Sequence, residues 1–124
     1  MKLLLDTHVV LWWTHDSAKI SAAARELLDD PRHEVLLSAV VAWEIAIKRA
    51  LRKLEVRDGL AVELVRGGVS ELPISVAHAA AVEQLPPHHA DPFDRMLVAQ
   101  ARAEGAVLLS GDESLRPYDV PVYW

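Results

Sequence analysis

The chain has 124 residues, of which 52% are hydrophobic and 25% charged, a composition typical of a globular protein and not of a disordered one. It has no cysteine, which excludes disulfides, thiolate metal sites and a cysteine nucleophile, and no apolar run approaches the length of a membrane span. The formal net charge of −5 argues against a broad nucleic-acid-binding surface but allows a local basic patch. We expect one domain over residues 1–124 and, because no signal peptide is recognisable, a cytoplasmic protein with no membrane partner.

Apolar runs and capping residues divide the first half of the chain into alternating strands and helices. Asp6, Ser21 and Ser38 each stand at a plausible N-cap, and Pro31 follows a helix end. The last helix of this half is apolar nearly all round at its start, which predicts that it is buried. In chain order we expect a strand at 2–5, a helix at 7–13, a helix at 21–30, a strand at 34–37 and a helix from 39 to about 53.

The second half of the chain shows the same signals. Gly67 and Gly68 end one helix, Pro86 and Pro87 stop another, and Gly105 ends a third. The expected elements are a helix at 60–66, a minor strand at 71–74, helices at 76–84 and 92–104, a strand at 106–109 and a last short strand at 120–123. Short apolar strands separated by helices long enough to be crossovers predict an α/β fold with a mostly parallel sheet covered on both faces.

The segment 89–101 carries two carboxylates at the start of a strongly helical stretch. Asp91 can serve as the N-cap and Pro92 suits the first helical position, which makes Asp94 the third helical residue. A carboxylate there meets free backbone N–H groups and the positive end of the helix dipole. Taken alone, this segment is explained by a good cap with an acidic first turn.

Four carboxylates from distant segments can converge at one end of the predicted sheet. Asp6 and Asp112 come at or just past the ends of strands, on the side where open parallel sheets bind ligands. Asp94 lies in the first turn of a helix, and Glu44 lies in the apolar run of the long helix. For the three aspartates, a capping or first-turn role is the alternative. Glu44 is costly to bury unless it binds a metal or pairs with Lys48, its i,i+4 neighbour.

Carboxylates that converge repel one another, and they stay ionised together only if a cation neutralises them. Oxygen ligands, with no cysteine and no HExxH pattern, favour Mg²⁺ or Mn²⁺ over zinc. An ion held in this way can lower the pKa of an attacking water and stabilise a leaving oxygen. The residues alone therefore indicate metal-dependent phosphoryl or phosphodiester chemistry.

Four blocks of the sequence, in this order and spacing, resemble the PIN-domain family, and most of all the VapC-type toxins of type II toxin–antitoxin pairs. The blocks are LLDTH at 4–8, SAVVAWEI at 38–45, DPFDRMLVAQA at 91–101 and LSGD at 109–112. The resemblance covers essentially the whole chain, and the third block is its most telling piece. One departure is that relatives often have a glycine before the Lys53-Leu54 pair, where this chain has Arg52.

This resemblance implies a PIN-like α/β/α sandwich and an endoribonuclease that depends on Mg²⁺ or Mn²⁺. It also implies inhibition by a small cognate antitoxin and, as in many members, a homodimer. Contact with operator DNA is expected only through the antitoxin.

The resemblance also carries site roles to particular residues. The matching acidic positions, which form the implied catalytic and metal-binding set, are Asp6, Glu44, Asp94 and Asp112. Asp6 and Asp94 are implied as direct metal ligands, and the other two as groups that bind the metal directly or through water and orient the attacking water. Asp91 is a further candidate, although its cap role already explains it, and Ser110 is expected to support the site by hydrogen bonding.

Other residues near these blocks have two interpretations each. The candidate RNA-binding residues form a basic stripe that a solvated helix face explains equally well: Lys48, Arg49, Arg52 and Lys53. His8, His88 and His89 can be metal ligands, but coordination by oxygen alone favours partly exposed groups that support the site. Of Trp12 and Trp13, we expect one in the core and the other either there or facing a partner.

Our main hypothesis is a ribonuclease toxin with a carboxylate-held metal ion. The alternative is a PIN-fold module that acts mainly through its antitoxin partner and operator DNA, with little cleavage activity. The intact carboxylate set favours the enzyme. A small phosphohydrolase that acts on metabolites also fits the metal site, but Asp6-Thr7-His8 lacks the second aspartate of a haloacid-dehalogenase-like motif.

Overall fold

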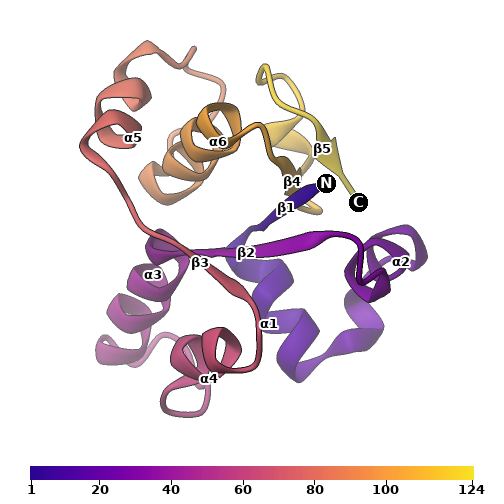
Figure 1. Ribbon diagram of the computed structural model, residues 1–124. Helices are drawn as coiled ribbons and strands as arrows, with labels where there is room; N and C mark the ends of the chain where they lie inside the picture. The colour runs from indigo at the N-terminus through magenta and orange to yellow at the C-terminus, as the bar shows by residue number, and fades with distance from the viewer.

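A five-stranded sheet forms the centre of the molecule, which a computed structural model describes over all 124 residues (Figure 1). The strand order is β3-β2-β1-β4-β5, and every neighbouring pair is parallel. The strands are β1 (Lys2–Leu5), β2 (Glu34–Ser38), β3 (Ser70–Leu72), β4 (Val107–Leu109) and β5 (Val122–Tyr123). The predicted α/β fold with a short, mostly parallel sheet is confirmed, and the sheet is parallel throughout.

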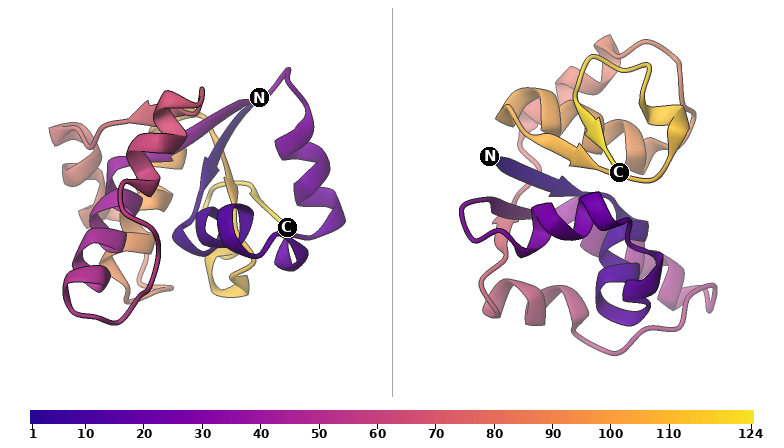
Figure 2. Two further views of the ribbon diagram at one scale, coloured as in Figure 1. Left: turned by 90° about the horizontal axis from the view of Figure 1, so that it is seen from below. Right: turned by 90° about the vertical axis from the view of Figure 1, so that its right-hand side faces the viewer.

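Six α-helices cover the two faces of this sheet (Figures 1 and 2). They are α1 (Thr7–His15), α2 (Ala22–Asp29), α3 (Ala39–Ala50), α4 (Leu60–Arg66), α5 (Val76–Ala81) and α6 (Pro92–Glu104). In Figure 1, α1, α3 and α4 lie below β2 and α2 lies to its right, whereas α5 and α6 lie above it. Right-handed crossovers explain this division, because the chain steps from β1 to β3 in one direction and then back across to β4. No helix is both long and apolar enough to cross a membrane.

The central strands β1 and β4 are buried, and they fix the residues that follow them. Five leucines of these strands have no exposed surface: Leu3, Leu4, Leu5, Leu108 and Leu109. Burial of each leucine side chain stabilises the folded state by roughly 2 kcal/mol. Apolar residues of α1, α3 and α6 join the same core. The backbone at Asp6 and Ser110, directly after these strands, is therefore held in place, and the Asp6 N–H donates to the Leu109 carbonyl at 3.2 Å.

The helix α3 ends earlier than the sequence predicts. It stops at Ala50, whereas we expected about 53, and that expectation is wrong because Arg52 takes a left-handed backbone with φ of 56°. The Arg52 N–H donates to the Arg49 carbonyl at 3.0 Å. The Lys53 N–H donates to the Lys48 carbonyl at 2.8 Å. These bonds form a Schellman motif, which usually has glycine at the left-handed residue, so an arginine conceals this helix stop in the sequence.

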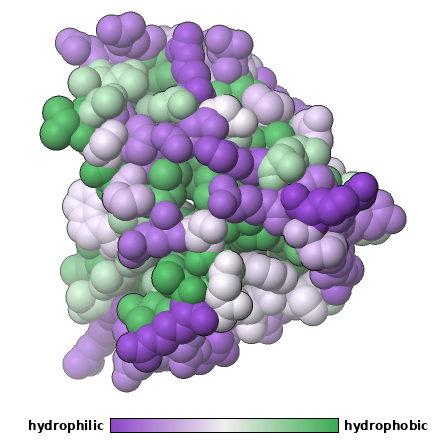
Figure 3. Space-filling view, in the orientation of Figure 1, coloured by the Kyte–Doolittle hydropathy of each residue, from purple (hydrophilic) through white to green (hydrophobic).

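An apolar groove lies between α3 and α4, beside β3. It has a volume of about 300 Å³, and six of its nine lining residues are hydrophobic. Ala39 and Ala42 of α3 face Ala61, Val62 and Val65 of α4 across it. Figure 3 shows this side of the molecule, where hydrophobic residues gather between hydrophilic ones. The small side chains of α3 thus leave room beside the exposed Val62.

A buried polar network fixes α6 relative to the start of α3. The Gln100 side chain on α6 has no exposed surface, and its Oε1 accepts a hydrogen bond from Ser38 Oγ at 2.5 Å. Its Nε2 donates to the Pro73 carbonyl at 3.2 Å and lies 3.3 Å from His78 Nδ1. Ser38 also caps α3 by accepting from the Val40 N–H at 3.0 Å. This network sets the position of the helix that carries Glu44 against the helix that carries Asp94.

We predict that Gln100→Leu lowers the free energy of unfolding by about 2 kcal/mol, because it leaves buried partners of Gln100 without their hydrogen bonds. Urea unfolding followed by circular dichroism measures the change. The same substitution at the exposed Gln84 is the control and should stay within about 0.5 kcal/mol of the wild type. Equal stability of the wild type and Gln100→Leu would show that the network does not hold the helices.

Candidate metal centre

Four carboxylates meet beyond the carboxyl ends of the central strands. Asp6 follows β1 directly, and Asp112 follows β4 after two intervening residues. Asp94 lies in the first turn of α6, and Glu44 lies in the middle of α3. The charges of Asp6 and Glu44 act on Asp94, and the charge of Asp112 acts on Asp6. Asp94 and Asp112 thus share one group of candidate ligand atoms with His89, and Asp6 and Glu44 lie within electrostatic reach of that group.

Asp6 is buried and serves the local fold and the site at once. Its Oδ1 accepts from the Val9 N–H at 2.8 Å and caps α1, as the sequence predicts. Its Oδ2 accepts a hydrogen bond from the Ser110 hydroxyl, which in turn accepts from the Asp112 N–H at 3.0 Å. Burial raises the pKa of Asp6, although the bonds from Ser110 and Val9 oppose the rise. Ser110 thus links the ends of β1 and β4 through the carboxylate.

Glu44 is only 4% exposed, and both of its carboxylate oxygens have donors. Thr7 Oγ1 donates to Oε1 at 2.6 Å, a contact between residues 37 positions apart that the sequence did not indicate. Lys48 Nζ donates to Oε2 at 2.5 Å, which is the expected i,i+4 pair. That hydrogen bond raises the pKa of Lys48, so the ammonium stays charged beside the acidic groups. Pairing with Lys48 therefore explains how Glu44 is buried, and it also places a cation at the cluster.

Asp91 and Asp94 differ in role: Asp91 caps α6, whereas Asp94 is left free for the site. Asp91 Oδ1 accepts from the N–H groups of Phe93 at 2.8 Å and of Asp94 at 3.4 Å, which confirms it as the N-cap of α6. The Asp94 carboxylate accepts none of these capping bonds. Burial raises its pKa to about 6, the negative charges of Asp91, Asp6 and Glu44 add to the rise, and His89 opposes it. The neutral form of Asp94 is thus favoured mainly by burial, and His89 is the group that opposes it.

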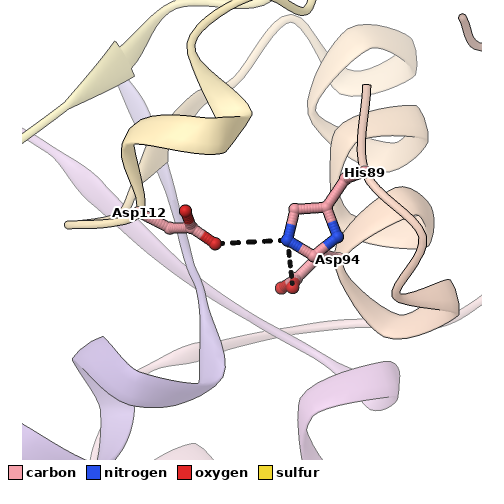
Figure 4. A group of neighbouring side chains, drawn as sticks. All are labelled: His89, Asp94 and Asp112. Carbon is pink, nitrogen blue, oxygen red and sulfur yellow. Dashed lines mark hydrogen bonds and ion pairs between the residues drawn. The ribbon is translucent and has the colours of Figure 1, made fainter. Parts of the chain in front are cut away.

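Asp112 and Asp94 both lie against Nε2 of the His89 imidazole (Figure 4). His89 Nε2 lies 3.3 Å from Asp112 Oδ2 and 3.5 Å from Asp94 Oδ2. Asp112 Oδ1 accepts from the N–H and the hydroxyl of Ser114 at 2.9 and 2.6 Å. Partial burial alone would raise the pKa of Asp112, but the bonds from Ser114 and His89 lower it below its usual value. The neighbouring His88 is exposed, with its ring edge on Tyr118.

The basic residues divide into Lys48 at the carboxylates and Arg49 and Arg52, which line a separate hollow together. Lys48 pairs with Glu44, whereas Arg49 forms an ion pair with the exposed Asp58. Arg52 and Lys53 lie beyond the end of α3, in its terminal turn. Only Lys48 therefore reaches the carboxylates, and the other three lie near the far end of the helix.

Aromatic rings flank the carboxylates. Trp12 and Trp13 are both partly buried against the core, so neither of them is a freely exposed partner contact. The Trp12 ring lies 5.4 Å from that of Trp124, whose indole covers Gly111 so closely that a Cβ there would come within 3.1 Å of it. A side chain at position 111 would therefore push the Trp124 indole by a few tenths of an ångström, a packing constraint next to Asp112 that sequence reasoning missed.

The donor set fits a hard divalent cation. The carboxylates of Asp6, Glu44, Asp94 and Asp112 offer only oxygen, the ligand that Mg²⁺ and Mn²⁺ prefer. His89 lies with Asp94 and Asp112 in a group whose candidate ligand atoms are within 4.8 Å of one another. Burial raises the pKa values of Asp6 and Asp94, and neighbouring carboxylates add to the rise, so a cation placed among them would favour their ionised forms.

We predict that Asp94→Asn stabilises the metal-free chain at pH 7 by about 1 kcal/mol, because the buried charge is removed. The pKa of Asp94 is about 6 in the folded chain, against an ordinary value of 3.8. So far as Asp94 is concerned, the folded state is therefore most stable, relative to the unfolded state, below about pH 4, and it loses this stability as the pH rises through 6. The advantage of Asp94→Asn should therefore shrink as the pH falls from 7 to 4. Urea unfolding in chelator across this range measures it, and a variant less stable than the wild type at pH 7 contradicts the assignment.

Known proteins share both the sequence pattern and the fold. Ribonuclease VapC22 from Mycobacterium tuberculosis is 29% identical over 126 residues, which cover 96% of this chain and 93% of that protein. Among solved structures, VapBC2 from Rickettsia felis bound to a promoter DNA fragment matches 100% of this chain and 99% of its own, with a TM-score of 0.76 and 12% identity. VapBC from Salmonella typhimurium bound to DNA matches 99% and 97%, with a TM-score of 0.71 and 15% identity.

A third solved structure, FitAcB from Neisseria gonorrhoeae, matches 98% of this chain and 96% of its own, with a TM-score of 0.65 and 20% identity. At these identities, the structural matches show a shared fold. The model of the family described as PIN domain matches residues 3–121, nearly the whole chain. The resemblance noted in the sequence is confirmed, and this chain belongs to the PIN domain family.

Proposed function

We propose that this chain is a Mg²⁺- or Mn²⁺-dependent endoribonuclease and the toxin of a type II toxin–antitoxin pair, acting in the cytoplasm. The observation that carries the proposal is the gathering of four carboxylates at the carboxyl edge of a PIN-domain sheet, where burial and neighbouring negative charges raise the pKa of Asp94. The name of the Mycobacterium tuberculosis relative, a ribonuclease, supports the same activity.

In the proposed site, Asp6 and Asp94 hold the metal directly, and Glu44 and Asp112 bind it directly or through water. When bound, a divalent ion supplies Lewis-acid chemistry to a phosphodiester and lowers the pKa of an attacking water. Asp6 is prevented from rotating by its two hydrogen bonds, from the Val9 N–H and from the Ser110 hydroxyl. The donors Thr7 and Lys48 fix the orientation of the Glu44 carboxylate, and so the direction of the lone pairs that remain free.

Lys48 is the basic group best placed to meet an RNA phosphate at the site. Its side chain is 40% exposed, and its charge acts on Asp91 and Asp94 as well as on Glu44. The exposed Arg52 and Lys53 are proposed to contact the RNA backbone farther from the reacting group, and Arg49 can join them if it leaves Asp58. Such contacts are independent of RNA sequence.

We predict that Asp6→Asn lowers RNA cleavage on the order of 100-fold or more, because it removes a metal ligand while an asparagine keeps the helix cap. Cleavage of a labelled single-stranded RNA in Mg²⁺ measures the effect, with circular dichroism as the check on folding. Asp119→Asn is the matched control, since its side chain is 88% exposed and pairs only with Arg102. If Asp6→Asn cleaves as fast as the wild type, or if chelator leaves the wild type active, the chain is not this kind of nuclease.

The groove between α3 and α4 is the proposed seat of the antitoxin. Several of the solved neighbours are two-component assemblies bound to DNA. An amphipathic segment of a partner can place an apolar side chain between the alanines of α3 and Val62, which is 55% exposed. Arg66 and Glu71 at the groove offer a charge of each sign for orientation. A homodimer, and contact with operator DNA through the antitoxin alone, complete the proposed assembly.

We predict that Val62→Asp weakens binding of the protein encoded beside this chain at least about tenfold, because a carboxylate would be buried in an apolar contact. Calorimetric titration of the co-expressed, separated partners measures the affinity. Val76→Asp is the control, since Val76 is 87% exposed and lies on α5, across the sheet. Undiminished binding by Val62→Asp would place the partner elsewhere. A chain that binds its partner but cuts no RNA would be a binding module instead of a nuclease.

A further inference from the structure

His89 faces the carboxylates with one ring nitrogen and the backbone with the other. Its Nδ1 lies 3.0 Å from the backbone nitrogen of Asp91, and its Nε2 lies 3.3 Å from Asp112 Oδ2. The His89 side chain is 19% exposed. Figure 4 shows its Nε2 between the carboxylates of Asp94 and Asp112.

The hydrogen bond at Nδ1 determines which nitrogen carries the proton. A backbone N–H can only donate, so His89 Nδ1 must accept from Asp91. The proton of the neutral ring is therefore on Nε2, the nitrogen that points at Asp112 and Asp94. A nitrogen that carries a proton has no lone pair to offer a metal. In this arrangement His89 is a hydrogen-bond donor to the carboxylates. Its Nε2 is close enough to them to share a metal ion, but in this tautomer it cannot be a metal ligand.

Hydrogen bonds with two side chains, Tyr118 and Arg95, hold the segment that carries His89. The His89 N–H donates to the hydroxyl of Tyr118, a residue that is only 3% exposed. Arg95 Nη1 also donates to that hydroxyl, at 3.2 Å. The same guanidinium donates to four loop carbonyls, those of Val82, Leu85, Pro86 and His89. The arginine of the DPFDR block thus fixes the loop from which His89 reaches the site.

The Asp112 side chain is the most exposed of the four carboxylates, so packing restrains it least. Its side chain is 42% exposed, and its other hydrogen bonds come from Ser114, two residues away in the same turn. His89 is the contact that ties the Asp112 carboxylate to the α6 side of the site.

We propose that His89 is a positioning residue of the carboxylate site, which holds Asp112 beside Asp94 through its Nε2–H group and does not itself bind the metal. The inference rests on the proposed function in one respect, that these carboxylates bind a divalent cation. Partners that orient metal-binding carboxylates typically change metal affinity about 10- to 100-fold when they are removed.

The first test needs no metal. Nitrogen NMR of the histidine rings in the metal-free wild type at neutral pH reports which ring nitrogen of His89 carries the proton. We expect the Nε2–H form. The Nδ1–H form would overturn the inference, because Nδ1 could then not accept from the Asp91 N–H.

The second test compares substitutions of His89 by Mn²⁺ titration. We expect His89→Leu to weaken Mn²⁺ binding about tenfold, and His89→Gln, whose amide can donate in place of Nε2–H, to stay within about threefold of the wild type. The control is His15→Gln, an exposed histidine at the end of α1 whose ring contacts Thr14, which should bind as the wild type does. Equal losses in His89→Leu and His89→Gln, or no loss in His89→Leu, would contradict the positioning role.

Pulsed electron paramagnetic resonance of the Mn²⁺-loaded wild type separates a positioning group from a ligand directly. We expect no coordinated nitrogen, and a nitrogen coupling that disappears in His89→Gln would make His89 a ligand. If the wild type binds Mn²⁺ but cuts no RNA, the proposed function fails and this inference stands on its own results. If it binds no Mn²⁺, the proposed function fails, and the tautomer alone decides whether His89 is the donor.

Discussion

The structure depends on holding four carboxylates together at the edge of a parallel sheet, against their mutual repulsion. Three of them receive donors from the protein: Asp6 from Val9 and Ser110, Glu44 from Thr7 and Lys48, and Asp112 from Ser114 and His89. Asp94 has only the His89 Nε2 at 3.5 Å, and burial together with the neighbouring carboxylates raises its pKa to about 6. The fold therefore leaves one position at which an added cation would relieve the repulsion most.

Local structure and site chemistry use the same residues without conflict. Asp6 caps α1 with one oxygen and turns the other toward Ser110. Asp112 likewise uses one oxygen in its own turn and the other toward His89. Helix capping and a role in the site therefore do not exclude each other, because the two oxygens of one carboxylate can serve one role each. For α6 the roles are divided instead, since Asp91 caps the helix and leaves Asp94 free.

The strands, the helix caps and the acidic set could be predicted because they depend on local patterns and on the rule that parallel strands end at one edge. The contacts that hold the acids could not. Thr7 with Glu44 and Ser38 with Gln100 join residues 37 and 62 positions apart, and their approach depends on how helices pack against the sheet. The early end of α3 was missed because Arg52 adopts a backbone conformation that glycine normally signals.

The central claim is that the carboxylates form a divalent-metal site that depends on Asp94. Calorimetric titration of Mg²⁺ into the wild type and into Asp94→Asn, at a pH above 7 where the wild-type carboxyl is ionised, tests it most directly. Our account predicts one saturable binding event in the wild type and a loss of at least about tenfold in affinity in the variant. Equal binding by the two proteins, or no binding by the wild type, would contradict it, and Asp94 would then be only a charge in the first turn of a helix.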